Sequence, residues 1–271
     1  MSYALVSFHA HPDDEALLAA GTLARAAADG HRIVLVVATD GAAGLTASSV
    51  LSGGTPLAAV RRRELSAAAT VLGISEVIDL GYGDSGDDGQ HVGERPAFAT
   101  TPPEQAAERL AAILRDVRAD VLTSYDAAGG YGHPDHRQVH AVAARAAELA
   151  RTPVLLEATV DRALLQRALR AVSWLPGVPT GFRADLSERF CPRAELTHRV
   201  DVRRFISAKR AAMAAHASQA SADRDARTLA FCLRLPHPLY TRVFGYEWFR
   251  EVGRAPGRPL LDDIFVSLRS R

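Results

Sequence analysis

The sequence predicts an α/β fold of the Rossmann-like type, in which an open, mostly parallel sheet carries helices on both faces and a smaller C-terminal cap. Strand-like and helix-like segments alternate over residues 1–172, as in parallel strands joined by crossover helices. The strand-like runs, such as Ile33–Ala38, are continuously apolar, which is typical of strands covered on both faces. A length of 271 residues with 48% hydrophobic and 23% charged residues suits a globular protein with a sizeable core.

The predicted elements follow one another from residue 4 to residue 158. The expected strands are the runs Ala4–Phe8, Ile33–Ala38, Glu76–Leu80, Val121–Tyr125 and Val154–Ala158. The expected helices cover residues 14–29, 57–72 and 134–150, and a further helix opens at Thr101–Glu104. Glycine-rich stretches at residues 40–56 and 81–101 predict two long loops between these elements.

Local signals predict several helix ends. Gly30 and Gly73 stand where a glycine commonly ends a helix. The run Thr101–Glu104, with the sequence Thr-Pro-Pro-Glu, predicts a capping box with proline in the first turn. The helix that follows is amphipathic, because its apolar residues recur at the spacing i, i+3, i+4 and i+7, namely Leu110, Ile113, Leu114 and Val117.

The alternation ends at about residue 173. The features that follow are an apolar loop at Trp174–Pro179, a further strand at His198–Val202, a helix over residues 203–220, and a segment rich in aromatic residues and proline at Leu229–Phe249. We interpret residues 173–271 as a cap on the sheet that is not an independent domain. Residues 1–271 are therefore expected to form one domain with a core over residues 1–172.

Charge and cysteine content narrow the class of protein. The net charge of +1 gives no electrostatic basis for binding nucleic acid or an anionic membrane. Cys191 and Cys232 stand alone, so neither a disulfide framework nor a thiolate zinc site is indicated. No signal peptide and no run of 18 apolar residues is visible, so we expect a cytoplasmic protein without a transmembrane segment. None of these features determines the oligomeric state.

The stretch His11–Glu15, with the sequence His-Pro-Asp-Asp-Glu, lies between the first strand and the first helix. Pro12 disfavours the α conformation at His11, which indicates a sharp turn. Asp13 and Asp14 occupy a helix start, where carboxylates are favoured, so ordinary helix capping is one interpretation. A histidine beside two carboxylates at the end of a strand favours a metal or catalytic site instead.

A second stretch, Tyr131–His136 with the sequence Tyr-Gly-His-Pro-Asp-His, follows the fourth strand. Ligands of open parallel sheets bind at the carboxyl ends of strands, where the strand order reverses. With the order 3-2-1-4-5, the first and fourth strands are neighbours and the two His-Pro-Asp turns face each other. Two imidazoles and one carboxylate suit zinc. The same set also suits non-haem iron(II), so the ion stays open.

These motifs resemble the PIG-L (LmbE-like) family of zinc-dependent N-deacetylases, which remove the acetyl group from substrates containing N-acetylglucosamine. The resemblance rests on the His-Pro-Asp-Asp-Glu turn, an Arg-x-x-Glu helix, an Asp-Ser-Gly loop, the Tyr-Gly-His-Pro-Asp-His loop and a C-terminal His-x-x-Gln helix. It implies a metal-dependent amide hydrolase that deacylates an N-acyl-glucosamine-containing small molecule. The attack is expected from a metal-bound water on the amide carbonyl.

The resemblance also implies roles for the residues of the first turn. It makes His11, Asp14 and His136 the ligands of Zn²⁺, with Fe²⁺ as the alternative ion. Asp13 becomes the general base that deprotonates the metal-bound water. Glu15 is expected to point away from the metal and to form a hydrogen bond or salt bridge.

Further roles concern the second turn. Tyr131 is implied as a donor to the developing oxyanion, with packing of the loop as the alternative. His133 is implied either as general acid on the leaving amine or as an electrostatic stabiliser, and a packed turn histidine is the competing interpretation. Asp135 is expected to hydrogen-bond a histidine and fix its tautomer.

Four residues are implied as substrate contacts. Arg61 is placed near the mouth of the site, although a surface basic run is the alternative. Asp84 is implied to bind sugar hydroxyls, with a turn aspartate as the alternative. His216 and Gln219 share one face of a helix and would close the site from the cap. A structural role for His216 is equally compatible with the sequence.

The substrate stays open in the sequence. The alternatives are a glucosamine-inositol precursor of a thiol cofactor, a conjugate of that cofactor cleaved by an amidase, and the acyl-glucosamine of a glycopeptide natural product. The segments Trp174–Phe182 and Leu235–Phe249 either line a mouth for a bulky group or pack the cap on the sheet. A dinucleotide-binding protein is disfavoured, because no Gly-x-Gly-x-x-Gly follows the first strand. A non-catalytic carbohydrate-binding relative is disfavoured by the complete catalytic set.

Overall fold

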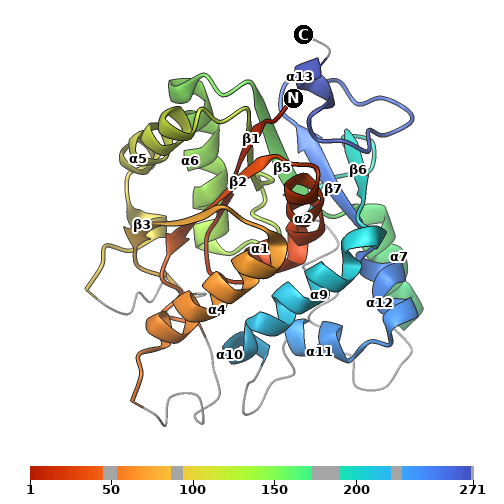
Figure 1. The fold of residues 1–271 in the computed structure, drawn as a ribbon, viewed down its shortest axis with the longest axis horizontal. Coiled ribbons are helices and arrows are strands. Elements are labelled where there is room, and N and C mark those ends of the chain that lie inside the picture. The colour runs from red at the N-terminus through yellow and green to blue at the C-terminus, as the bar shows by residue number, and fades with distance from the viewer. Residues whose placement is uncertain (45–53, 87–93, 173–188, 221–227, 270–271) are drawn as a thin grey trace.

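The computed structural model describes residues 1–44, 54–86, 94–172, 189–220 and 228–269 of the chain (Figure 1). Within these residues the strands form one seven-stranded sheet with the order β3-β2-β1-β4-β5-β7-β6. The strands are β1 Ala4–His9, β2 Arg32–Thr39, β3 Glu76–Tyr82, β4 Val121–Tyr125, β5 Val154–Thr159, β6 His198–Asp201 and β7 Tyr246–Glu251. The first five are parallel, and β7 runs antiparallel to both β5 and β6. The predicted fold class and the order 3-2-1-4-5 are confirmed.

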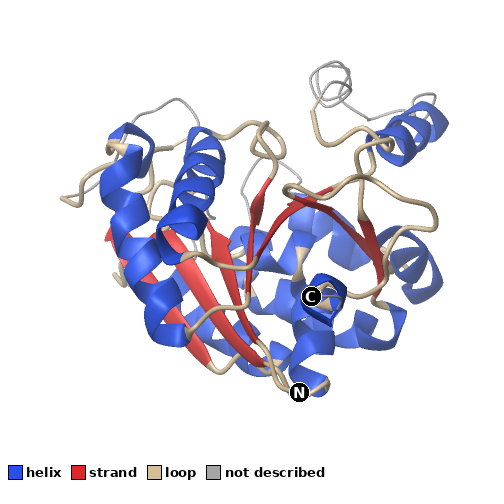
Figure 2. Cartoon of the chain, turned by 90° about the horizontal axis from the view of Figure 1, so that it is seen from above, coloured by secondary structure: helices blue, strands red, loops and turns tan. Residues whose placement is uncertain are grey.

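Helices lie on both faces of this sheet (Figure 2). The α-helices are α1 Asp14–Leu18, α2 Ala20–Ala28, α4 Leu57–Leu72, α5 Pro103–Val117, α6 Pro134–Ala150, α7 Arg162–Val172, α9 Ile206–Ala215, α10 Ala217–Ala220, α11 Thr228–Arg234, α12 His237–Phe244 and α13 Val266–Arg269. Two short 3₁₀ turns are η1 Phe98–Thr100 and η2 Arg203–Phe205. None of the helices in the described residues is long and apolar enough to span a bilayer.

Alternate residues of the central strands divide the core between the two faces. Val6 and Phe8 of β1 pack in one cluster with the apolar stripes of α5 and α6. Leu5 of the same strand packs on the other face with Leu23 of α2. The second face is then covered by α4 and α9, which lie side by side (Figure 1). This arrangement leaves the carboxyl ends of β1 and β4 as the place where loops can form a site.

The first predicted helix is wrong in its continuity, because it breaks at Ala19 into α1 and α2. The backbone N–H groups of Gly21 and Thr22 donate to the Glu247 carboxylate of β7 at 2.9 and 2.7 Å. Lys209 of α9 binds the same carboxylate at 2.6 Å. A buried side chain from the far end of the chain therefore caps α2, and this signal is not local in sequence.

Two other local predictions are also wrong. No side chain caps the start of α5, whose N-cap is Pro102, and the Thr101 hydroxyl instead donates to the Ala97 carbonyl at 2.9 Å. Pro103 does occupy the first turn, as expected. The helix predicted over residues 203–220 is interrupted at His216, which separates α9 from α10. The His216 side chain is drawn inward to Glu15, which explains this interruption.

The C-terminal third contributes directly to the sheet. Strand β7 pairs with β5, and β6 pairs with β7. Within Leu235–Phe249, Tyr240 and Phe249 are fully buried in the hydrophobic core. Tyr240 packs among helices that include α4 and α9, and Phe249 lies in β7 of the sheet itself. The companion segment Trp174–Phe182 lies outside the described residues.

Candidate metal centre and active site

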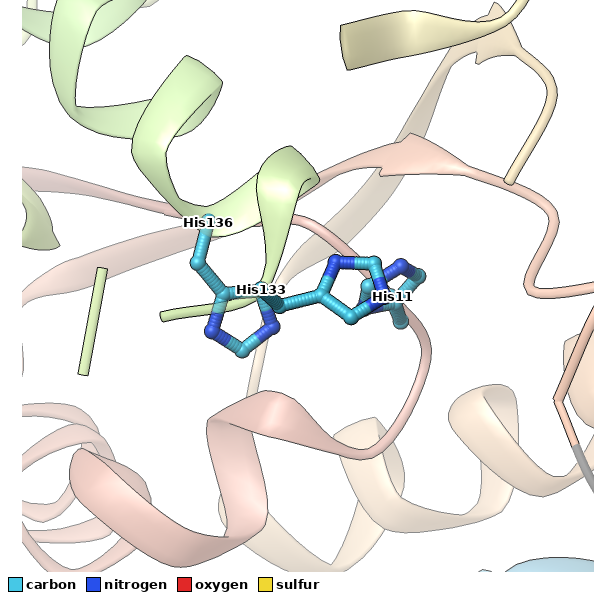
Figure 3. A group of neighbouring side chains, drawn as sticks. All are labelled: His11, His133 and His136. Carbon is cyan, nitrogen blue, oxygen red and sulfur yellow. The ribbon is translucent and has the colours of Figure 1, made fainter. Parts of the chain in front are cut away.

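The two His-Pro-Asp turns meet at the carboxyl ends of β1 and β4. These strands are adjacent and parallel, with Leu5 opposite Val121, so the loops that follow them emerge side by side. Figure 3 shows the rings of His11, His133 and His136 gathered at the start of α6. The ring of His11 lies 4.7 Å from that of His133 and 5.4 Å from that of His136, between centroids. The predicted convergence of the two loops is therefore present.

Two overlapping groups of side chains in this site could hold a metal ion. His11, His133 and His136 each offer a nitrogen within 4.8 Å of the others, and His11 and His133 form a second such group with Asp84 and Asp135. Asp14 lies outside both groups but joins two of the histidines. Its Oδ2 is 3.3 Å from His11 Nδ1, and its Oδ1 is 3.4 Å from His136 Nε2. The three predicted ligands are thus neighbours, and His133 and Asp84 lie beside them.

The residues present fit a divalent metal ion. His136 Nε2 is buried and has no hydrogen-bond partner among the described residues. A buried ring nitrogen without a partner is costly in a folded protein, and metal coordination would satisfy it. Imidazole and carboxylate are ligands of zinc and of non-haem iron alike. The site therefore suits a metal, and its donor set does not choose between the two ions.

The electrostatics of the site favour a cation. Burial opposes the charged form of His11, but hydrogen bonds to Asp135, Asp14 and Asp84 raise its pKa well above the usual range. Burial would raise the pKa of Asp14, yet His136 and His11 hold it well below its usual value. Burial, followed by the neighbouring His11 and His136, lowers the pKa of His133 to about 4. Ionised carboxylates thus stand beside a neutral imidazole in a buried site.

Asp13 has an unusual backbone conformation. Its φ of 126° and ψ of −22° lie in a region that residues other than glycine rarely adopt. Such a conformation costs about 1–3 kcal/mol and persists only when surrounding contacts impose it. Burial raises the pKa of the Asp13 carboxyl to about 6, against the opposing effect of the Arg61 guanidinium. A carboxylate with a pKa close to neutrality is well suited to accept a proton.

Asp135 makes the histidine contact that the sequence predicts. It is fully buried, and His11 Nε2 lies 3.2 Å from its Oδ2. The backbone N–H of Ser85 donates to Oδ2 at 3.0 Å, and the Ser85 hydroxyl donates to Oδ1 at 2.6 Å. Asp135 therefore links the loop after β3 to the candidate metal site, and Ser85 is an additional part of that site.

Tyr131 stands at the opening of the site. It is 45% exposed, and its ring meets that of His136 edge-on at 4.8 Å between centroids. The loop that carries it has positive φ values at Gly129, Gly130 and Gly132, which glycine adopts without strain. Its role as an oxyanion donor stays a prediction.

The four predicted substrate contacts are all buried around the same site. Arg61 is 3% exposed and lies against Asp13, and His216 is 0% exposed and binds Glu15. Asp84 Oδ1 lies 3.4 Å from His11 Nε2. Gln219 is buried on α10, and its side-chain amide donates to the Ser218 hydroxyl at 3.3 Å. Arg61, Asp84 and His216 thus contact residues of the two turns, while contact of any of the four with a sugar stays a prediction.

Sequence reasoning missed a chain of buried polar side chains next to the candidate metal site. The Tyr125 ring stacks on His136 at 4.5 Å between centroids, and its hydroxyl is 3.0 Å from His9 Nδ1. His9 Nε2 in turn is 2.8 Å from the Ser7 hydroxyl. The available signal was the presence of polar residues in the otherwise apolar strands β1 and β4. Partners of this kind orient the side chains that bind a metal.

Comparison with known proteins yields a family and a fold. The family model described as PIG-L: GlcNAc-PI de-N-acetylase matches residues 6–147. The chain is 35% identical over 287 residues to the 1D-myo-inositol 2-acetamido-2-deoxy-alpha-D-glucopyranoside deacetylase of Streptomyces avermitilis, with 96% of both chains covered. It is 36% identical to the enzyme of the same name from Streptomyces griseus subsp. griseus, with 97% of this chain and 88% of the relative covered.

The solved structures agree on the fold. N,N'-diacetylchitobiose deacetylase from Pyrococcus horikoshii, complexed with its inhibitor MPG, superposes with a TM-score of 0.57. The superposition covers 93% of this chain and 84% of that one, at 24% sequence identity. At this level of identity the likeness supports the architecture of the sheet and its helices.

Proposed function

The chain belongs to the PIG-L family of GlcNAc-PI de-N-acetylases, and from this premise we propose that it hydrolyses the N-acyl group of a glucosamine-containing small molecule. The predicted family and the predicted class of enzyme, an N-deacetylase, agree with the names of its relatives. The observation that carries the proposal is the gathering of three histidines and Asp14 in one buried site, with His11 and Asp14 on the turn that also carries Asp13. This is the combination that hydrolysis of an amide needs, a cation site beside a spare acid.

We propose that His11, Asp14 and His136 hold a zinc ion, with iron(II) as the alternative. The contacts of Asp14 with His11 and His136, and the absence of a hydrogen bond at His136 Nε2 among the described residues, support this ligand set. When bound, zinc acts as a Lewis acid and lowers the pKa of a water to about 7. Asp13 follows Pro12 on the same turn and accepts the proton of the attacking water.

His133 is proposed to stabilise charge as a neutral hydrogen-bond donor. The backbone N–H of Asp135 donates to His133 Nδ1 at 3.1 Å, so this nitrogen carries no proton. The proton of the neutral ring is then on Nε2, which can donate to the developing oxyanion. Of the two roles expected for His133, this geometry supports electrostatic stabilisation over general acid catalysis. Asp13, once protonated, can return its proton to the leaving amine.

Substrate recognition is assigned to Tyr131, Asp84 and Gln219. Tyr131 is exposed on its glycine-flanked loop and is proposed as a second donor to the oxyanion. Asp84 and Gln219, which are both buried, are also proposed to contact the sugar. Arg61 and His216 already bind Asp13 and Glu15, so we propose that they act through those residues.

The first substrate to test is an inositol-linked N-acetylglucosamine, because two relatives at 35% and 36% identity carry that name. Purified enzyme of known metal content should be assayed on this compound, on acyl-glucosamines of increasing chain length, on thiol-cofactor conjugates and on acylated glycopeptides. Release of acetate that requires metal and is abolished by a chelator supports the proposal. Equal turnover with and without chelator would refute it.

Domain organisation and location form part of the same proposal. We propose that residues 173–271 are a dependent cap, since β7 pairs with β5 and Glu247 caps α2. A fragment of residues 173–271 should then fail to fold on its own, as judged by circular dichroism. We place the enzyme in the cytoplasm, where the free and buried Cys191 and Cys232 would stay reduced.

A further inference from the structure

We infer that Glu15 and His216 are positioning residues, which together with Arg61 hold Asp13 in the conformation required of a base. The inference rests on the proposed function, because it takes Asp13 as that base. All three residues act on Asp13 through contacts that converge on its backbone and its carboxylate. They approach it from three separate elements, α1, α4 and the junction of α9 with α10.

Glu15 holds the backbone of Asp13. The N–H of Asp13 donates to Glu15 Oε2 at 3.1 Å, which binds the residue at its positive φ. The other oxygen, Oε1, accepts a hydrogen bond from His216 Nε2 at 2.6 Å. Glu15 and His216 are both 0% exposed, so neither can exchange its partner for water. His216 therefore fixes Glu15, and Glu15 fixes Asp13.

Arg61 holds the carboxylate and the turn. Its Nη2 lies 3.0 Å from Asp13 Oδ1 and donates to the Pro12 carbonyl at 2.5 Å. Its Nη1 donates to the Gly41 carbonyl at 2.7 Å. A Cβ at Gly41 would lie 2.5 Å from Nη1, so glycine there gives the guanidinium its room. The planar fork of arginine thus connects three points of the site, which a lysine cannot do.

The helix that carries Arg61 also stabilises the His216 segment. Glu64, one turn further along α4, accepts the Ser218 backbone N–H at 2.7 Å and the Ser218 hydroxyl at 2.6 Å. This bond fixes α10 immediately after His216. The Arg-x-x-Glu pair therefore secures Asp13 directly through Arg61 and indirectly through the His216–Glu15 pair.

The contacts of Glu15, His216 and Arg61 account for the unfavourable backbone conformation of Asp13. Asp13 has a φ of 126°, and the unfavourable conformation needs contacts that impose it. A purely structural network would stabilise the fold without affecting turnover in particular. A positioning network predicts a loss of kcat that depends on the presence of Asp13.

The test compares Glu15→Ala, His216→Ala and Asp13→Asn, each with its metal content and melting temperature measured. We expect Glu15→Ala and His216→Ala to lower kcat at least tenfold, with KM within twofold of the parent and an unchanged metal stoichiometry. Glu15→Gln, which keeps an oxygen for the Asp13 N–H, should recover most of the kcat. In the Asp13→Asn background, measured at high enzyme concentration, Glu15→Ala should lower the residual rate no further.

A matched control is Glu157→Ala, which removes another buried carboxylate that pairs with a histidine, His140, at 3.3 Å. It should change stability and leave kcat unchanged. If Glu15→Ala and His216→Ala both fail to fold, Arg61→Lys tests the positioning role instead, because lysine keeps the positive charge and lacks the planar guanidinium. That variant should also lose at least tenfold in kcat while retaining metal.

The outcomes separate this inference from the proposed function. If Asp13→Asn is inactive while folded Glu15→Ala and His216→Ala turn over at the parent rate, the positioning role is wrong and the base assignment stands. The positioning role would also be wrong if kcat of the double variant fell by the product of the factors measured for Glu15→Ala and Asp13→Asn separately. Full activity of Asp13→Asn would overturn the role of Asp13 as base and with it this inference, whereas the absence of metal-dependent hydrolysis by the parent enzyme would overturn the proposed function.

Discussion

Replacing Glu247 by alanine should be among the most destabilising substitutions in this chain. Its carboxylate is 2% exposed, binds Lys209 Nζ at 2.6 Å, and accepts the Gly21 and Thr22 N–H groups at 2.9 and 2.7 Å. Removing one partner of a buried ion pair costs about 3–5 kcal/mol. Each backbone N–H left without an acceptor adds about 1–3 kcal/mol unless water reaches it. We therefore expect the free energy of unfolding to fall by at least about 4 kcal/mol.

The assay is urea unfolding followed by circular dichroism, with midpoint and slope both fitted. The matched control is Glu247→Gln, which keeps an oxygen for the two N–H groups and should lose roughly half as much. The double variant Glu247→Gln with Lys209→Met removes the unpaired buried charge and should recover stability relative to Glu247→Gln alone. A loss below about 1 kcal/mol for Glu247→Ala would refute the view that this carboxylate joins β7 to α2.

Three further predictions concern the metal site, acid stability and one glycine. His136→Ala should lose metal and activity together, whereas Asp13→Asn should keep its metal and lose turnover, as measured by elemental analysis and acetate release. Burial lowers the pKa of His198 to about 4. Between about pH 6.5 and pH 4 the unfolded chain therefore binds more protons at this histidine than the folded chain does. The stability due to the neutral His198 ring is fully present above about pH 6.5 and is lost as the pH falls towards 4, by about 1–2 kcal/mol at pH 5. Urea midpoints of the parent and His198→Gln should converge at pH 5, and a constant difference would contradict this. Gly41→Ala, at a φ of 66° and against Arg61, should lower kcat about tenfold in steady-state assays; unchanged kcat would show that Arg61 can move freely.

The parallel core was predictable because its signals are local. Continuous apolar runs and glycine stops identify β1, β2 and α4 without knowledge of the tertiary structure. The break at Ala19 was not predictable, because its cause is Glu247, which is far away in the sequence. The interruption at His216 has the same origin in Glu15. In each case a distant carboxylate overrides the helix propensity of an alanine-rich segment.

The candidate site was likewise predictable only in part from the sequence. The types and spacing of the residues in the two His-Pro-Asp turns predicted that the turns would converge, because adjacent parallel strands must deliver their loops to the same edge. The positive φ of Asp13 could not be read from its sequence, since aspartate adopts it only under imposed contacts. The contact between Arg61 and Asp13 was equally hidden, because the neighbouring Arg62 and Arg63 resemble an exposed basic run.

Lys209 gives this protein a built-in probe of its own local opening. It is the only lysine in the sequence, and it is 1% exposed in its pair with Glu247. Side-chain acylation by an amine-selective reagent therefore has to wait until α9 separates from β7. The rate of that modification can be followed by mass spectrometry. It reports the rate of this one local opening in the native ensemble without any engineered label.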